Sequence, residues 1–80
     1  MSRVRKVIPQ LAAAMMGKDP RFVRKGLQTG LLPFGKAIMV ETEGSVQRYS
    51  YYISPRLFME YTGFTEEDII MAAEAGGFSY

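Results

Sequence analysis

The stretch that decides the fold runs from residue 8 to residue 30 and reads IPQLAAAMMGKDPRFVRKGLQTG. Its first half has apolar residues at i, i+3, i+4 and i+7, which is the spacing of one face of a helix. These residues are Ile8, Leu11, Ala12 and Met15. A helix is therefore predicted to begin near Pro9 and to end at Gly17.

A second helix is predicted after a very short link. Asp19 is a good N-cap acceptor, and Pro20 has the fixed φ that suits the first helical position. The helix is expected to run to about Thr29, where Gly30 supplies a left-handed terminus. Two helices joined by a link of this length are typical of a helix-turn-helix.

The predicted second helix has an apolar side and a cationic side. Val23 and Leu27 lie four residues apart on the apolar side. The cationic side repeats at helical spacing and comprises Arg21, Arg24, Lys25 and Gln28. Gly26, inside the helix, costs about 1 kcal/mol of helix propensity relative to Ala. Its presence predicts a close approach, either to the Ala side chains of the first helix or to the backbone of a ligand.

Beyond Gly30 the pattern becomes that of strands. Two stretches rich in β-branched and aromatic residues, 37–41 and 46–53, flank a short segment that contains Gly44, which predicts a β-hairpin. Alternation along the second strand puts three residues on its more apolar face, and these are Tyr49, Tyr51 and Ile53.

Two further helices are predicted after the hairpin. Ser54-Pro55 repeats the cap-and-proline start, and Leu57, Phe58 and Tyr61 form the apolar stripe of a third helix that closes the core. Thr65 can cap a fourth helix, with Asp68 as its capping-box acid and Phe64 spaced to staple onto Ile69. This helix either lies on the core or pairs with a second copy through Ile69, Ile70, Ala73 and the tail residues Phe78 and Tyr80.

This order of elements predicts one α+β domain with a winged helix-turn-helix fold over residues 1–80. We expect a basic arm at 1–7, the helix-turn-helix at 8–29, a β-hairpin wing at 36–53 and C-terminal helices at 54–76. The 48% apolar and 22% charged residues are ordinary for a globular chain.

Composition also excludes several classes of function. The chain has no Cys and no His, so it lacks disulfides, thiolate metal sites and the commonest acid–base group. We therefore expect no enzyme activity, no cofactor and no metal. No apolar run approaches the roughly 20 residues that span a bilayer, so a cytoplasmic protein without membrane association is expected.

The net charge of +2 conceals a strong separation of charge along the chain. Residues 1–36 contain eight cations and one acid, whereas residues 37–80 contain two cations and seven acids. Such asymmetry predicts that one half of the chain faces a polyanion.

The cationic side of the second helix has side chains suited to the major groove of DNA. Arg and Lys donate to guanine or to phosphate oxygens, and Gln forms a bidentate pair with adenine. We expect binding to double-stranded DNA, with Arg21, Arg24, Lys25 and Gln28 in the groove. Phosphate contacts are expected from Lys18, Lys36, Arg48, Arg3, Arg5 and Lys6. A solvated charged face is the alternative interpretation.

Three further segments are informative: LAAAMMG at 11–17, FVR at 22–24 and GLLPFG at 30–35. Together they resemble segments of small winged helix-turn-helix proteins related to MerR-type regulators and phage excisionases. The segment YYISPRLF at 51–58 is similar to one common in small phage and mobile-element proteins of Gram-positive bacteria. The resemblance covers residues 7–62 and implies a small transcriptional regulator or an excisionase-like recombination directionality factor.

The resemblance also implies roles for individual residues. The recognition helix would be Pro20 to Thr29 and the wing Glu41 to Arg48, with Arg24 directed toward DNA and Arg48 near the phosphates. The sequence departs from this family at Glu41 and Glu43, which put negative charge where a wing usually carries cations. A hairpin that serves only as the outer wall of the core is the alternative.

Two other functions stay open at this level. An aromatic cluster could stack single-stranded bases if its rings are not needed in the core, and it comprises Tyr49, Tyr51, Tyr52, Phe58 and Tyr61. The same scaffold could instead be a protein-interaction adaptor that contacts a recombinase or another protein through the hairpin and the last helix. The sequence leaves the choice between a monomer, a homodimer and a side-by-side oligomer on DNA open.

Overall fold

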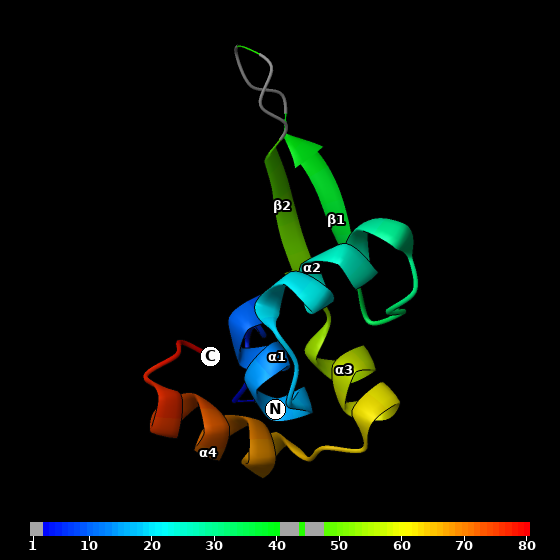
Figure 1. The fold of residues 1–80 in the computed structure, drawn as a ribbon. Coiled ribbons are helices and arrows are strands. Elements are labelled where there is room, and N and C mark those ends of the chain that lie inside the picture. The colour runs from blue at the N-terminus through cyan, green and yellow to red at the C-terminus, as the bar shows by residue number, and fades with distance from the viewer. Residues whose placement is uncertain (1–2, 41–43, 45–47) are drawn as a thin grey trace.

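The described residues, 3–40, 44 and 48–80 of this computed structural model, form four helices and one two-stranded antiparallel sheet (Figure 1). In chain order the elements are α1 (Pro9–Met16), α2 (Pro20–Thr29), β1 (Gly35–Val40), β2 (Arg48–Ile53), α3 (Pro55–Thr62) and α4 (Glu66–Gly76). The α+β class, the four predicted helices and the antiparallel hairpin are thus confirmed, although β1 begins two residues before the predicted stretch 37–41, and the layout is compatible with a small winged helix.

The helix boundaries lie where the capping residues predict them. Asp19 accepts a hydrogen bond from the backbone N–H of Arg21 at 2.8 Å, which satisfies one orphan donor of α2. At α4, Thr65 and Asp68 form a complete capping box, in which each side chain accepts from the other residue's backbone N–H. Gly17, at φ 69°, ends α1 and leaves only residues 17–19 to turn the chain into α2.

The core lies around α1, which packs against both α2 and α4. Leu11, Ala12 and Ala13 are fully buried on α1, and Val23 is fully buried on α2. The two largest buried side chains are Phe34 and Phe58, whose rings meet edge to face with centroids 5.2 Å apart. Phe34 belongs to the loop between α2 and β1, so this contact packs that loop against α3 in the core.

The hairpin has an inner and an outer face, because directly paired residues of an antiparallel sheet lie on the same side. The inner pairs are Gly35–Ile53, Ala37–Tyr51 and Met39–Tyr49. Ile53 is buried and Tyr51 packs against the core, so this face is turned toward the helices. The outer pairs, Lys36–Tyr52, Ile38–Ser50 and Val40–Arg48, consist entirely of exposed residues.

Two details of packing differ from the sequence-based expectations. In α3 only Phe58 of the expected stripe is buried, whereas Leu57 and Tyr61 are 43% and 50% exposed. The close approach at Gly26 is made to Leu32, because a Cβ at Gly26 would lie 2.5 Å from the Leu32 side chain. The chain folds back over α2 immediately after its end, and neither a first-helix Ala nor a ligand is needed to explain this glycine.

The fourth helix lies on the core. Ile69 and Ala73 are fully buried and Ile70 is 6% exposed, so these residues are not available to pair with a second copy. Phe64, before the helix, packs against the same core, and so do Phe78 and Tyr80 after it. In the described part of the chain, no helix has both the length and the apolar character that crossing a membrane requires.

Candidate nucleic-acid interface

The cationic side of α2 faces away from the core. Val23, Gly26 and Leu27 are buried on one side of the helix. On the opposite side Arg21, Lys25 and Gln28 are exposed and Arg24 is half-buried. These four residues form what we call the α2 ridge, and its outward direction agrees with the sequence-based expectation.

Arg21, at the start of the ridge, has an acidic partner. Its Nε and one terminal nitrogen each lie 3.2 Å from a carboxylate oxygen of Asp19, the N-cap of the same helix. These side-chain hydrogen bonds, together with the backbone bond from Arg21, hold the pKa of Asp19 below its usual range and raise the pKa of Arg21. Both side chains are more than half exposed, so water and salt screen the pair.

Arg24 and Lys25 form no ion pair with any acid among the described residues. They are therefore the two ridge cations outside any ion pair in that part of the chain, and Arg24 contributes only a longer-range attraction to Asp19, which helps to lower the pKa of that carboxyl. Lys18 adds a third cation beside the start of α2, with its ammonium 5.3 Å from the centroid of the Phe22 ring. Phe22 is itself 47% exposed, so this contact lies at the surface.

Gln28 connects the ridge to the hairpin. Its side-chain nitrogen donates to the hydroxyl of Tyr51 at 2.7 Å. Tyr51 is on the inner face of β2, so the hydrogen bond restricts the amide of the last ridge residue from a different element. The sequence placed Tyr51 on the more apolar face of its strand but contained no signal that its hydroxyl meets Gln28.

Lys36 and Arg48 lie on the outer face of the hairpin, opposite to the face that carries Tyr51. The structure therefore does not bring these two predicted contact residues together with the α2 ridge. At the expected wing tip, Glu41 and Glu43 are outside the described residues, whereas Gly44 has a positive φ of 98°.

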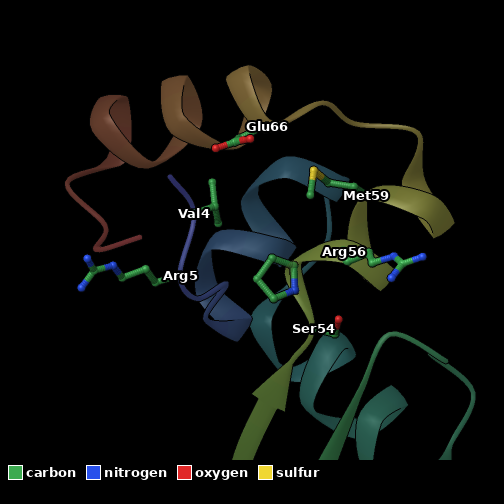
Figure 2. A pocket seen from close by; sticks show the side chains of 7 residues that line it. Val4, Arg5, Ser54, Arg56, Met59 and Glu66 are labelled. Atoms are coloured by element: carbon green, nitrogen blue, oxygen red, sulfur yellow. The ribbon is translucent and has the colours of Figure 1, made fainter. Parts of the chain in front are cut away.

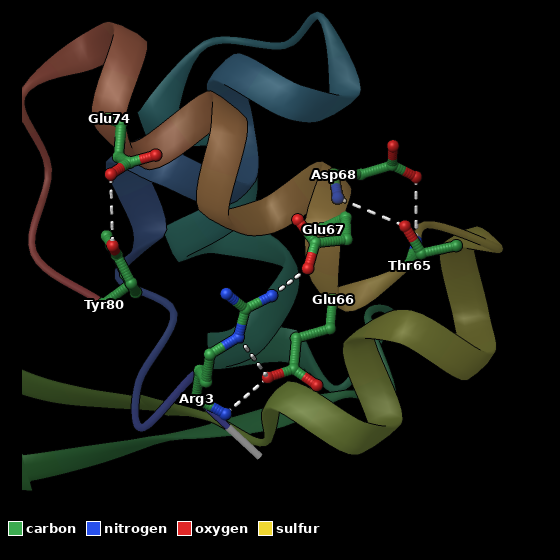
Figure 3. Close-up of polar contacts among 7 residues, drawn as sticks. All are labelled: Arg3, Thr65, Glu66, Glu67, Asp68, Glu74 and Tyr80. Carbon is green, nitrogen blue, oxygen red and sulfur yellow. Dashed lines mark hydrogen bonds and ion pairs between the residues drawn. The ribbon is translucent and has the colours of Figure 1, made fainter.

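The N-terminal segment is a packed part of the domain and does not form a separate arm. Val4 and Val7 are 4% and 3% exposed, and the backbone N–H of Arg5 donates to the carbonyl of Tyr80 at 2.6 Å. Arg3 forms an ion pair with Glu67, and its backbone N–H donates to Glu66 (Figure 3). Arg3 is thus held against α4, which corrects the expectation that it belongs to a basic arm.

A hollow of about 580 Å³ lies between this segment and α3. Its lining includes two arginines, Arg5 and Arg56, together with Ser54 and Glu66. Figure 2 shows that the two arginine side chains extend away from each other at the rim. Arg56 also pairs with Glu60, with Nε and Oε1 3.3 Å apart. The hollow therefore does not direct the two cations at one ligand.

Four of the eight acidic residues of the chain lie on α4, away from the ridge. Glu66, Glu67 and Asp68 occupy its first turn, where they suit the positive end of the helix dipole, and Glu74 lies near its end. Because α1 packs between α2 and α4, these four carboxylates are separated in space from the α2 ridge (Figure 1).

The aromatic rings do not share one surface. Phe58 is buried, Tyr49 and Tyr51 are on the inner face of the hairpin, and Tyr52 is on the outer face. Tyr61 packs its ring edge to face on Phe34, with centroids 5.4 Å apart. A continuous stacking platform for single-stranded bases is thus not formed by these residues. Within the described ranges, no three acidic side chains gather as metal ligands.

Comparison with known proteins found no matching family model, no matching curated protein and no matching solved structure.

Proposed function

We propose that this protein binds double-stranded DNA through the α2 ridge. The observation that carries the proposal is the pair Arg24 and Lys25, which lie on the outward side of α2, the second of two helices joined by a short turn, and form no ion pair among the described residues. A helix in this position enters the major groove in helix-turn-helix proteins. The carboxylates of α4, which would repel phosphates, are on the other side of α1.

Each ridge residue has a separate role in this proposal. Arg24 and Lys25 donate to guanine or to phosphate oxygens, and Lys18 neutralises phosphate beside the start of the helix. Arg21 exchanges Asp19 for a phosphate, which is a small change because the Arg21–Asp19 pair is exposed. Gln28 offers its amide to an adenine while Tyr51 limits the rotation of that amide.

The other predicted contact residues contribute less to this interface. Arg5 and Lys6 are exposed but belong to the segment packed near α4, and Arg3 is paired there. Lys36 and Arg48 can reach a phosphate backbone only from the outer face of the hairpin. At the level of biology, we propose a small transcriptional regulator or an excisionase-like recombination directionality factor, without enzyme activity or cofactor, in the cytoplasm.

A direct test is fluorescence anisotropy with a random-sequence duplex at about 50 mM and about 200 mM salt. We expect binding at low salt and a slope of log K against log salt of roughly −0.9 per phosphate contacted. Arg24→Ala with Lys25→Ala is expected to flatten the slope by about 2, since each phosphate-contacting cation contributes about 1. Arg56→Ala, which removes an exposed arginine from α3, is the matched control and should leave the slope unchanged.

The absence of binding to duplex DNA at low salt would overturn the proposal. If binding is found, selection from random duplexes defines the preferred site, and Arg24→Ala then separates two roles. A loss of about 1–3 kcal/mol confined to one base pair indicates a base contact, whereas equal weakening on all sequences indicates a phosphate contact.

A further inference from the structure

The ring of Tyr51 is fixed by the core while its hydroxyl reaches the α2 ridge. α2 packs against β1 at the base of the hairpin (Figure 1). The Tyr51 ring packs against the core, lies opposite the small residue Ala37 in the sheet, and has its centroid 6.2 Å from that of Tyr49. These contacts leave the ring little freedom, so its hydroxyl has a defined position beside the end of α2.

Packing explains the ring of Tyr51 but not its hydroxyl, because a Phe at this position would fill the same space against the core. The hydroxyl accepts the hydrogen bond from Nε2 of Gln28 at 2.7 Å. Gln28 is exposed, and a long side chain of this kind loses much conformational entropy when it is ordered. The hydrogen bond therefore orders Gln28 before DNA binds, which lowers the entropy cost of a contact made by its amide.

The same hydrogen bond determines which atoms of the Gln28 amide face outward. A Gln amide has two N–H donors and one carbonyl acceptor. Tyr51 takes one N–H, which leaves the carbonyl and the second N–H side by side. Adenine presents one donor, N6–H, and one acceptor, N7, in the major groove, so these two groups match adenine. Guanine presents two acceptors, O6 and N7, and the Gln28 carbonyl would repel one of them.

A reversed amide would have the opposite preference. If the Tyr51 hydroxyl donated to the carbonyl of Gln28, both N–H groups would face outward, and two donors suit the two acceptors of guanine. In the structure the amide nitrogen lies against the Tyr51 hydroxyl, which corresponds to the adenine pattern. The base that is selected at this position therefore reports on the orientation of the amide.

We propose that Tyr51 is a positioning residue that makes Gln28 select adenine, so that the hairpin sets one base preference without touching the base. This inference rests on the proposed binding of duplex DNA through the α2 ridge. It gives the hairpin a role that does not depend on phosphate contacts. Lys36 and Arg48, which carry the charge for such contacts, lie on the outer face, whereas Tyr51 acts from the inner face through Gln28.

The test compares base preference among variants on one duplex site selected with the wild-type chain. At each A·T pair of that site, fluorescence anisotropy measures the loss of affinity when the pair becomes G·C or when the adenine becomes 7-deazaadenine, which lacks the N7 acceptor. At one position the wild-type chain should lose about 5- to 150-fold with G·C, the range for one bidentate contact, and less with 7-deazaadenine. Gln28→Ala should abolish both losses at that position.

Tyr51→Phe keeps the ring and removes only the hydroxyl. It should reduce the preference at this position by about 2- to 12-fold, the range for one neutral hydrogen bond, and leave the salt dependence on random duplex unchanged. The matched control is Tyr49→Phe, which removes the hydroxyl of the neighbouring ring on the same face of β2 and should keep the full preference. Because the preference is a ratio of two affinities of one variant, a smaller folded fraction weakens both affinities equally and cancels.

The outcomes separate this inference from the proposed function. Absence of binding to any duplex would overturn both. Binding with the salt dependence expected for Arg24 and Lys25 would support the proposed function, and four results would then overturn the inference alone. These are no adenine that depends on Gln28, guanine selected in place of adenine, full preference in Tyr51→Phe, or an equal loss in Tyr49→Phe.

Discussion

The helices α2 and α4 are built alike toward the core and differently toward solvent. Each begins at a side-chain cap, buries three residues and ends before a left-handed glycine. Outward, α2 presents Arg24 and Lys25, whereas α4 presents Met71 among carboxylates. Packing against α1 requires the inner faces and the caps but not these outward charges. The outward residues are therefore the ones that distinguish what each helix can bind.

The largest effect is expected from reversing the charge of the α2 ridge, because this change removes the difference in charge between the outward faces of α2 and α4. Arg24→Glu with Lys25→Glu removes two cationic contacts of about 1–3 kcal/mol each and adds repulsion, so duplex affinity should fall by at least 30-fold. Fluorescence anisotropy at low salt measures the loss. Glu74→Lys, a reversal on α4, should leave affinity unchanged or slightly increased. Equal losses for both helices would show that only net charge matters and that the ridge has no special role.

The inner face of α2 contains one small residue, Gly26, that allows the Leu32 side chain to pack closely. Gly26→Ala gains about 1 kcal/mol of helix propensity. It also drives a methyl group into Leu32, and overpacking of this kind costs about 1–3 kcal/mol. We expect a net decrease in the free energy of unfolding of up to about 2 kcal/mol, measured by urea denaturation.

Leu32→Ala provides the control for this contact. Combined with Gly26→Ala, it removes the steric conflict, so the double variant should lose less stability than the sum of the two single variants. Strict additivity would show that Leu32 is not the neighbour that requires glycine at position 26.

The features that the sequence could predict are the ones that depend on neighbours along the chain. Asp19-Pro20, the capping box at Thr65 and the glycine at position 17 act within one turn of a helix, so each helix lies where the sequence predicts it. The direction of the α2 ridge followed from the same local periodicity, because Val23 and Leu27 define the buried side.

The features that were missed depend on contacts between distant residues. Gln28 and Tyr51 are 23 residues apart, and Arg3 and Glu67 are 64 apart. Periodicity within one element contains no information about such pairs. Val4 and Val7 were assigned to a basic arm because two valines among cations give no clear pattern, although both are buried. Most of the fold was therefore predictable, whereas the partners of the site residues were not.

The caps of the two helices are expected to make a smaller contribution than their inner faces. Thr65→Ala removes the hydroxyl that accepts from the backbone of Asp68 and should lower the free energy of unfolding by about 1 kcal/mol. Thr65→Ser retains the hydroxyl and should lose much less. Both are measured by chemical denaturation. A full loss with Ser would indicate that the Thr methyl, and not the cap, stabilises the start of α4.

The smallest expected effect concerns Asp19, which is both the cap of α2 and the partner of Arg21. Asn is as good an N-cap as Asp, so Asp19→Asn should change stability little near neutral pH while it removes the charge that compensates Arg21. The pKa of Asp19 is lowered in the folded state by its hydrogen bonds from Arg21. Its contribution to stability is therefore present above the unfolded pKa and is lost as pH falls through the folded pKa.

The lowered pKa of Asp19 leads to two predictions, one for stability and one for DNA binding. In denaturation curves between about pH 2 and pH 7, any advantage of the wild-type chain over Asp19→Asn should disappear at the acid end. At neutral pH the variant should bind duplex DNA a few-fold more tightly, because Arg21 no longer shares its charge with a carboxylate. Weaker binding would mean that Asp19 orients Arg21 for its contact, so that α2 would need Asp19 for binding as well as for folding.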